Sequence, residues 1–117
     1  FEGTPAQMLS SLDKLSALPG ATRVCCTHEY TLSNLNFARA VEPGNAELMQ
    51  YVQHCQALRA RDVPTLPSTI AREQQINPFL RARVPAVAQA ARAHDAATPP
   101  DAVGVFATLR QWKNEFK

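Results

Sequence analysis

The sequence predicts a mainly α-helical chain with about five helices and one short strand. Three observations indicate this fold class. Apolar residues recur with the helical period over most of the chain, residues that start and stop helices flank these segments, and only residues 23–27 have the pattern of a short buried strand. The 117 residues are 45% hydrophobic and 19% charged, which suits one compact domain with a packed core.

The first half of the chain contains three predicted helices. The first begins after Thr4, where Pro5 and Gln7 complete a capping box, and it ends at Pro19 and Gly20. The second covers Thr31–Val41 and follows the strand. The third is capped by Asn45 and runs to about residue 61, with an apolar face made of Leu48, Tyr51, Val52, Cys55 and Leu58.

Prolines divide the second half into shorter pieces. Pro64, Pro67 and Pro78 leave room only for a short helix near residues 69–75. Another helix begins at Pro85, and residues 93–100 form a loop. The last helix follows a capping sequence at residues 98–101 and extends to near Lys117.

Charge and composition exclude several classes of protein. The net charge of +2 is too small for a general nucleic-acid binder, and no apolar run is long enough for a membrane span or a signal peptide. The three cysteines have no C-x-x-C spacing, so we expect reduced, mostly buried thiols in a cytoplasmic protein. We interpret four arginines as solvated: Arg59, Arg61, Arg81 and Arg83.

His28 is the first candidate site residue, because it directly follows the predicted strand. A strand end can hold an imidazole rigidly, as a metal ligand requires. The alternative is a half-buried histidine that only makes hydrogen bonds. His54 and His94 are isolated in the sequence, and His54 is expected at the surface.

The last helix carries a stripe of cations. At 100° per residue, Arg110, Lys113 and Lys117 fall directly beside an apolar stripe. Such cations could receive a carboxylate or a phosphate at the rim of the surface on which the helix packs. The alternative is a solvated helix edge, where cations are favoured near the C-terminus. The apolar stripe consists of Val105, Leu109, Trp112 and Phe116.

Seven blocks of sequence, in order along the chain, are similar to one family. They include Thr-His-Glu-Tyr-Thr at residues 27–31 and lie at residues 1–4, 27–31, 34–38, 41–45, 63–69, 77–81 and 110–116. The chain resembles the C-terminal half of glyoxalase II, the hydroxyacylglutathione hydrolases of the metallo-β-lactamase superfamily. The resemblance implies that residues 1–30 end a metallo-β-lactamase αββα domain and that residues 31–117 form a helical glutathione-binding domain.

The resemblance also implies an activity. Glyoxalase II hydrolyses S-(2-hydroxyacyl)glutathione, typically S-lactoylglutathione, to glutathione and a 2-hydroxy acid such as D-lactate, and so detoxifies methylglyoxal. Two divalent metal ions (zinc, iron or manganese) supply the hydroxide that attacks the thioester.

Four positions match functional residues of the family. His28 matches the last metal ligand, Tyr30 a tyrosine that contacts glutathione, and Arg110 with Lys113 the basic pair that holds the glycine carboxylate. Lys117 is expected to be solvated. Some members have a tyrosine at the position of Phe1, so any hydroxyl contact there is missing.

The remaining metal ligands of the family would lie upstream of residue 1. The chain alone is therefore expected to lack hydrolase activity and to need the missing N-terminal half. The main alternative is a non-catalytic helical module that binds glutathione or another small anion. A persulfide dioxygenase of the same superfamily fits the helical tail and the basic pair less well, and a nucleic-acid module would need a broader basic surface.

Overall fold

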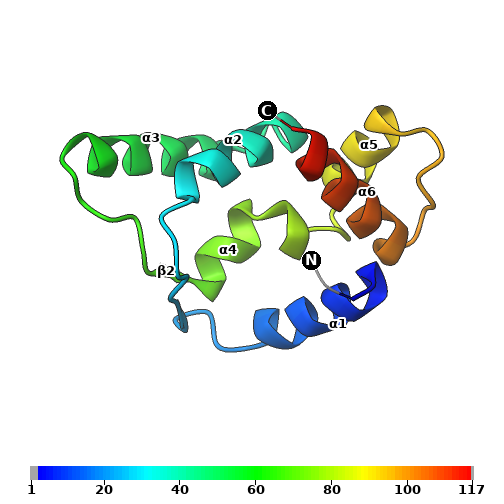
Figure 1. The fold of residues 1–117 in the computed structure, drawn as a ribbon, viewed down its shortest axis with the longest axis horizontal. Coiled ribbons are helices and arrows are strands. Elements are labelled where there is room, and N and C mark those ends of the chain that lie inside the picture. Colours follow the sequence, from blue (N-terminus) through cyan, green and yellow to red (C-terminus); the bar gives the residue numbers. More distant parts are fainter. Residues whose placement is uncertain (1–2, 117) are drawn as a thin grey trace.

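The computed structural model describes residues 3–116 and shows a mainly helical chain (Figure 1). The helices α1 (Pro5–Ser16), α2 (Thr31–Val41), α3 (Ala46–Ala60), α4 (Ile70–Ile76), α5 (Pro85–His94) and α6 (Ala102–Glu115) are joined by a 3₁₀ turn, η1 (Pro78–Leu80). Two strands of two residues each, β1 (Arg23–Val24) and β2 (Ser68–Thr69), complete the fold. The predicted fold class is confirmed, and Phe1 and Lys117 lie outside the described residues.

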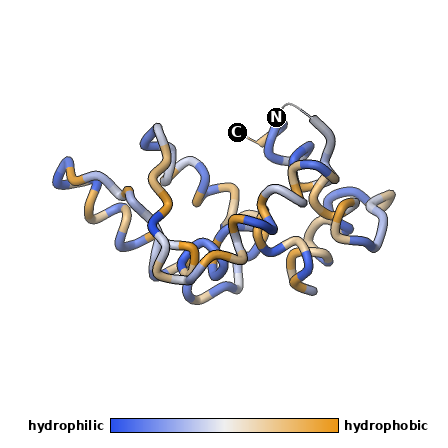
Figure 2. The backbone as a smooth tube through the Cα atoms, turned by 90° about the horizontal axis from the view of Figure 1, so that it is seen from below, coloured by the Kyte–Doolittle hydropathy of each residue, from blue (hydrophilic) through white to orange (hydrophobic). Residues whose placement is uncertain are grey.

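Helix starts are fixed by side chains that the sequence had indicated. Thr4 and Gln7 form a reciprocal capping box at α1, and Asn45 accepts a hydrogen bond from the amide of Leu48 at α3. Asp101 caps α6 through the amide of Gly104. Figure 2 shows hydrophilic and hydrophobic residues interspersed along the coiled parts of the chain, a pattern that suits helices with one buried face.

The core has two parts. One joins α1, α5, α6 and the end of α2, and the other joins α2, α3 and the end of α4. Phe37 in α2 belongs to the first part and is 1% exposed. Its ring lies 5.5 Å from that of Trp112, 5.5 Å from that of Phe116 and 6.0 Å from that of Phe79. Through these aromatic contacts, α6 and η1 pack against α2.

The prediction of a buried strand at residues 23–27 was wrong. Only Arg23 and Val24 are in β1, which pairs antiparallel with β2 through Arg23↔Thr69 and Val24↔Ser68. Cys25 and Cys26 are exposed, whereas Cys55 is fully buried as predicted. Within residues 3–116 the sheet has only two strands, so the apolar residues after Val24 have no layer to pack against.

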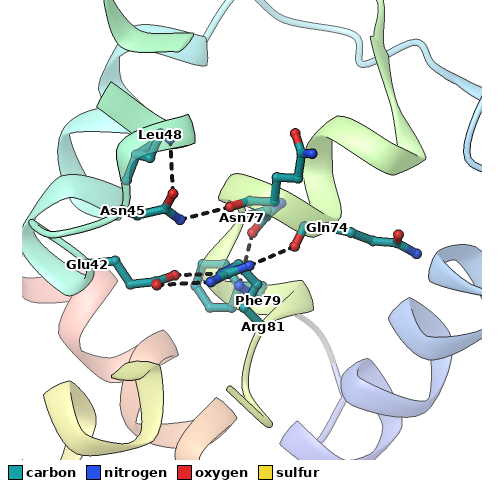
Figure 3. Close-up of polar contacts among 8 residues, drawn as sticks. Glu42, Asn45, Leu48, Gln74, Asn77, Phe79 and Arg81 are labelled. Carbon is teal, nitrogen blue, oxygen red and sulfur yellow. Dashed lines mark hydrogen bonds and ion pairs between the residues drawn. The ribbon is translucent and has the colours of Figure 1, made fainter. Parts of the chain in front are cut away.

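Arg81 is not solvated, contrary to the prediction. Its guanidinium forms a bidentate pair with Glu42, with N–O distances of 2.6 and 3.0 Å, and also donates to the carbonyl of Gln74 (Figure 3). Glu42 is only 7% exposed. The pair therefore joins the C-terminus of α2 to the chain after η1 and to the end of α4. Arg83, by contrast, is exposed and pairs with Asp13 at the surface.

Within the described range no helix is both long enough and apolar enough to cross a membrane.

Candidate functional site

A pocket of about 320 Å³ lies between the loop after β1, the helices α2 and α6, and the segment around α4 and η1. The four residues predicted to act on metal or substrate all line it: His28, Tyr30, Arg110 and Lys113. The structure thus brings together two groups that are far apart in the sequence. Phe79, Leu35 and Ala38 are among the apolar residues that line the same pocket.

One end of the pocket is a loop. His28 and Tyr30 are both exposed, Tyr30 by 62%, and their rings stack at 4.9 Å with an interplanar angle of 9°. The expectation that His28 directly follows a buried strand is wrong, because β1 ends at Val24. The half-buried alternative is wrong as well. An exposed imidazole in a loop is accessible to a ligand but is not rigidly placed by its own strand.

The other end of the pocket is α6. Arg110 and Lys113 lie one turn apart and are partly buried beside the fully buried Leu109. Arg110 and Lys113 therefore lie next to a packed apolar face as predicted, whereas Lys117, the third cation of the predicted stripe, lies outside the described residues. Trp112 stacks on His94 at 4.3 Å, which further fixes the helix against α5. Arg110 also lines a smaller cavity of about 170 Å³ at the start of α1.

A set of polar residues in the pocket wall was not predicted from the sequence. Glu73 accepts hydrogen bonds from the Ser68 hydroxyl at 3.0 Å and from the Asn77 side-chain amide at 3.3 Å. Both partners line the pocket with Glu73, as does Tyr51. Glu73 and Asn77 are separated by one helical turn, a spacing that could have indicated this contact. Burial raises the pKa of the Tyr51 phenol to about 12, with smaller contributions from Cys55.

Glu29 was assigned no role from the sequence, yet the structure gives it clear partners. Its carboxylate accepts the backbone N–H of Thr65 at 3.0 Å and the hydroxyl of the same residue. The Thr65 hydroxyl also lies 2.6 Å from that of Thr31. The hydrogen bond from the Thr65 hydroxyl lowers the pKa of the Glu29 carboxyl, and the bond from the Thr65 amide adds to this. Glu29 therefore connects the loop to a segment 36 residues later in the chain.

Comparison with known proteins identifies the family. The model for "Hydroxyacylglutathione hydrolase C-terminus" matches residues 29–116. This chain belongs to that family. A relative from Albidiferax ferrireducens, named hydroxyacylglutathione hydrolase, is 63% identical over 99% of this chain and 45% of its own length. Proteins of the same name from Cupriavidus taiwanensis (62% identity, 100% of this chain, 44% of the relative) and Alkalilimnicola ehrlichii (55%, 98%, 45%) are also similar.

The chain spans about 45% of the length of these hydroxyacylglutathione hydrolases. This limited coverage bears on any metal site. No group of three or more His, Cys, Asp or Glu side chains in residues 3–116 is arranged to hold a metal ion. His28 by itself is a suitable imidazole donor, but a single donor does not make a protein metal site of the zinc type. The described residues can therefore contribute a ligand to such a site but do not complete one.

Proposed function

We propose that this chain is the C-terminal part of a thioester hydrolase that converts S-(2-hydroxyacyl)glutathione to glutathione and a 2-hydroxy acid. S-Lactoylglutathione is the proposed substrate and D-lactate the product. The observation that carries the proposal is that His28, Tyr30, Arg110 and Lys113 line one pocket. The names of the relatives support the same activity.

In this proposal the α6 end of the pocket binds the glycine carboxylate of glutathione. Arg110 offers a planar fork that matches a carboxylate, and Lys113 adds a second positive charge one turn later. Both cations project from a helix whose other face is packed, so their positions are set before the ligand arrives. Tyr30 lies at the opposite end, where a phenol can contact the ligand closer to the thioester.

We also propose that the complete enzyme holds two divalent metal ions (zinc, iron or manganese). Such ions, when bound, supply a hydroxide nucleophile at neutral pH. His28 would provide one neutral imidazole ligand, and residues upstream of this chain would provide the others. Because a thiolate is a good leaving group, the pocket needs no strong acid beside the sulfur atom. The thioester would thus lie at the loop end while the glycine carboxylate lies at α6.

We assign residues 1–30 to the end of a metallo-β-lactamase-type domain and residues 31–117 to a helical glutathione-binding domain of a cytoplasmic protein. The exposure of Cys25 and Cys26 supports this division, because these apolar residues directly after β1 are left for a further part of the protein to cover.

Replacing the basic pair tests the proposal. In the full-length enzyme, Arg110→Ala and Lys113→Ala should each raise KM for S-lactoylglutathione by roughly ten- to a hundredfold, as expected for a lost charge-assisted hydrogen bond. The kcat should change less, because the carboxylate is remote from the reacting bond. Arg92→Ala is the matched control, since Arg92 is an exposed cation on α5 that does not line the pocket. An unchanged KM in both pocket variants would contradict the assignment.

A non-catalytic module that binds glutathione or a small anion is the second candidate. It is favoured by one observation: the basic pair and its supporting helix lie entirely within the described residues. Two assays on the purified chain separate the candidates. We expect no turnover of S-lactoylglutathione with added zinc or iron, because the ligand set is incomplete. Calorimetric titration with glutathione should show binding that Arg110→Ala abolishes if the module alone suffices.

A further inference from the structure

The segment at residues 63–67 forms part of the pocket wall and is anchored at both ends. Leu66 and Ser68 line the pocket. At the later end, Ser68 pairs with Val24 and its hydroxyl donates to Glu73. At the earlier end, the backbone N–H and the hydroxyl of Thr65 both donate to Glu29. The carboxylate of Glu29 therefore links the loop that carries His28 directly to the wall that carries Leu66, and the contact between the Thr65 and Thr31 hydroxyls adds a second link at the start of α2.

Glu29 occupies a distinctive position in this loop. The residues on either side of it, His28 and Tyr30, line the pocket, whereas Glu29 does not. Its side chain instead reaches Thr65, which is only 6% exposed. One carboxylate oxygen receives the N–H and the other receives the hydroxyl, so the orientation of the carboxylate is fixed relative to Thr65. Fixing residue 29 in this way sets the direction in which its two neighbours leave the backbone.

We propose that Glu29 is a positioning residue for the hydrolase: through Thr65 it holds the His28–Tyr30 loop against the Leu66 wall and so sets the geometry of the loop end of the pocket. The inference rests on the proposed function, because His28 and Tyr30 take their roles from it. Glu29 itself touches neither metal nor substrate. It acts through the backbone: its bonds to Thr65 hold residue 29 and so restrict where the neighbouring His28 can point.

The link has few substitutes within the described residues. β1 ends at Val24, so no strand pairing reaches residues 25–30. Stacking of His28 on Tyr30 joins the two side chains to each other but not to the rest of the fold. Loss of the charge on this side chain would weaken both charge-assisted hydrogen bonds from the largely buried Thr65, which favours movement of the wall and the loop together.

Four variants of the full-length enzyme test the proposal. Glu29→Gln keeps the shape and removes the charge, Thr65→Val removes the hydroxyl, Thr65→Ser keeps it, and the fourth variant combines Glu29→Gln with Thr65→Val. Glu47→Gln is the control, because Glu47 is exposed on α3 and away from the pocket. The readouts are kcat and KM for S-lactoylglutathione, metal content per chain, the thermal midpoint, and hydrogen exchange at the Thr65 amide.

Glu29→Gln should lower kcat/KM by roughly ten- to a hundredfold, in the range found for outer partners of metal ligands. It should also speed exchange at Thr65, with a thermal midpoint close to that of Glu47→Gln. Thr65→Val should lose part of the activity, Thr65→Ser should retain it, and the double variant should be little worse than Glu29→Gln alone because the two residues form one link.

Three results would overturn the proposal: kcat/KM and Thr65 exchange unchanged in Glu29→Gln, additive effects in the double variant, or Thr65→Ser as impaired as Thr65→Val. A loss of thermal stability with kinetics of the folded protein unchanged would reduce Glu29 to a purely structural residue. If the parent protein does not hydrolyse the thioester, the proposed function fails, whereas Thr65 exchange still decides whether the link exists. If Glu29→Gln does not fold, the Thr65→Val and Thr65→Ser pair decides the matter.

Discussion

The two ends of the pocket are supported in different ways. At one end, Arg110 and Lys113 stand on a helix of fourteen residues whose opposite face contacts the core. At the other end, His28 and Tyr30 stand on an exposed loop that is linked to the Thr65 segment by the Glu29 carboxylate and continues into the start of α2. The helix end is thus set by side-chain packing, and the loop end by a few polar contacts.

This difference indicates which functions each end can serve within this chain. A packed helix presents charges at fixed positions without further help, which suits recognition of a carboxylate. An exposed loop with one imidazole needs additional ligands and additional walls before it can support a metal centre. We therefore expect recognition to depend on residues within the chain and chemistry to depend on His28 together with ligands from outside the chain.

The largest effect should come from the loop end. In the full-length enzyme, His28→Ala should reduce bound metal to near one ion per chain. It should lower turnover by more than the roughly ten- to a hundredfold that loss of an outer partner of a metal ligand costs. Metal analysis and kinetics on the same sample provide the measurement. His54→Ala is the control, because His54 is exposed on α3 and away from the pocket. Full metal occupancy in His28→Ala would refute the role of His28.

The helix end should be most sensitive to loss of its aromatic anchor. Phe37→Ala removes the ring that contacts Phe79, Trp112 and Phe116 and should lower the free energy of unfolding by roughly 3–5 kcal/mol. Leu18→Ala, at a position 44% exposed, should cost less than about 0.5 kcal/mol. Urea denaturation followed by fluorescence of Trp112 measures both. Equal losses would show that α6 is not held by this cluster.

Two arginine ion pairs allow a buried and an exposed contact to be compared for their contribution to stability. Arg81→Met leaves the largely buried Glu42 carboxylate without its partner and should destabilise the protein by about 2–3 kcal/mol. Arg83→Met breaks the exposed pair with Asp13 and should cost at most about 1 kcal/mol. Denaturation of the two variants under identical conditions tests the difference. A larger loss of stability for Arg83→Met than for Arg81→Met would contradict the assignment of Arg81–Glu42 as the ion pair that stabilises the fold.

A smaller effect should appear only at alkaline pH. The pKa of Tyr51 is about 12 in the folded protein, against 10.0 for an ordinary tyrosine. The folded state therefore keeps the phenol proton after the unfolded state has lost it, and the free energy of unfolding should fall as pH rises through this interval. The loss should amount to at most about 3 kcal/mol. Tyr51→Phe should remove it, as urea denaturation at neutral pH and near pH 11 would show.

Much of the fold could be predicted because its determinants are local. Thr4, Asn45 and Asp101 cap helices where the sequence indicated, and the buried positions of α3 follow the helical period. Cys25 and Cys26 were misplaced because strand burial depends on neighbouring strands, which a local pattern does not contain. Arg81 was misplaced for a similar reason, since its partner Glu42 lies 39 residues earlier.

The site was predictable to different degrees at its two ends. The basic stripe of α6 followed from helical geometry, although its ligand came only from the family resemblance. For His28 the geometric argument was wrong, because the residue lies in a loop, and only the Thr-His-Glu-Tyr-Thr motif directed attention to it. Glu29 and Glu73 escaped notice because their hydrogen-bond partners are set by tertiary structure. The roles of His28, Tyr30, Arg110 and Lys113 stay predictions until the variants are measured.

The pairing of Val24 with Ser68 encloses both α2 and α3 within one long chain excursion. Closing such an excursion carries an entropic cost that grows with its length, whereas the α2–α3 hairpin forms from neighbouring residues. We expect the hairpin to form early during refolding and the strands to pair late. Ligand affinity would then be the last property regained during refolding. Stopped-flow measurements of helical circular dichroism and of glutathione binding, made in parallel, should therefore show binding that lags behind helix formation.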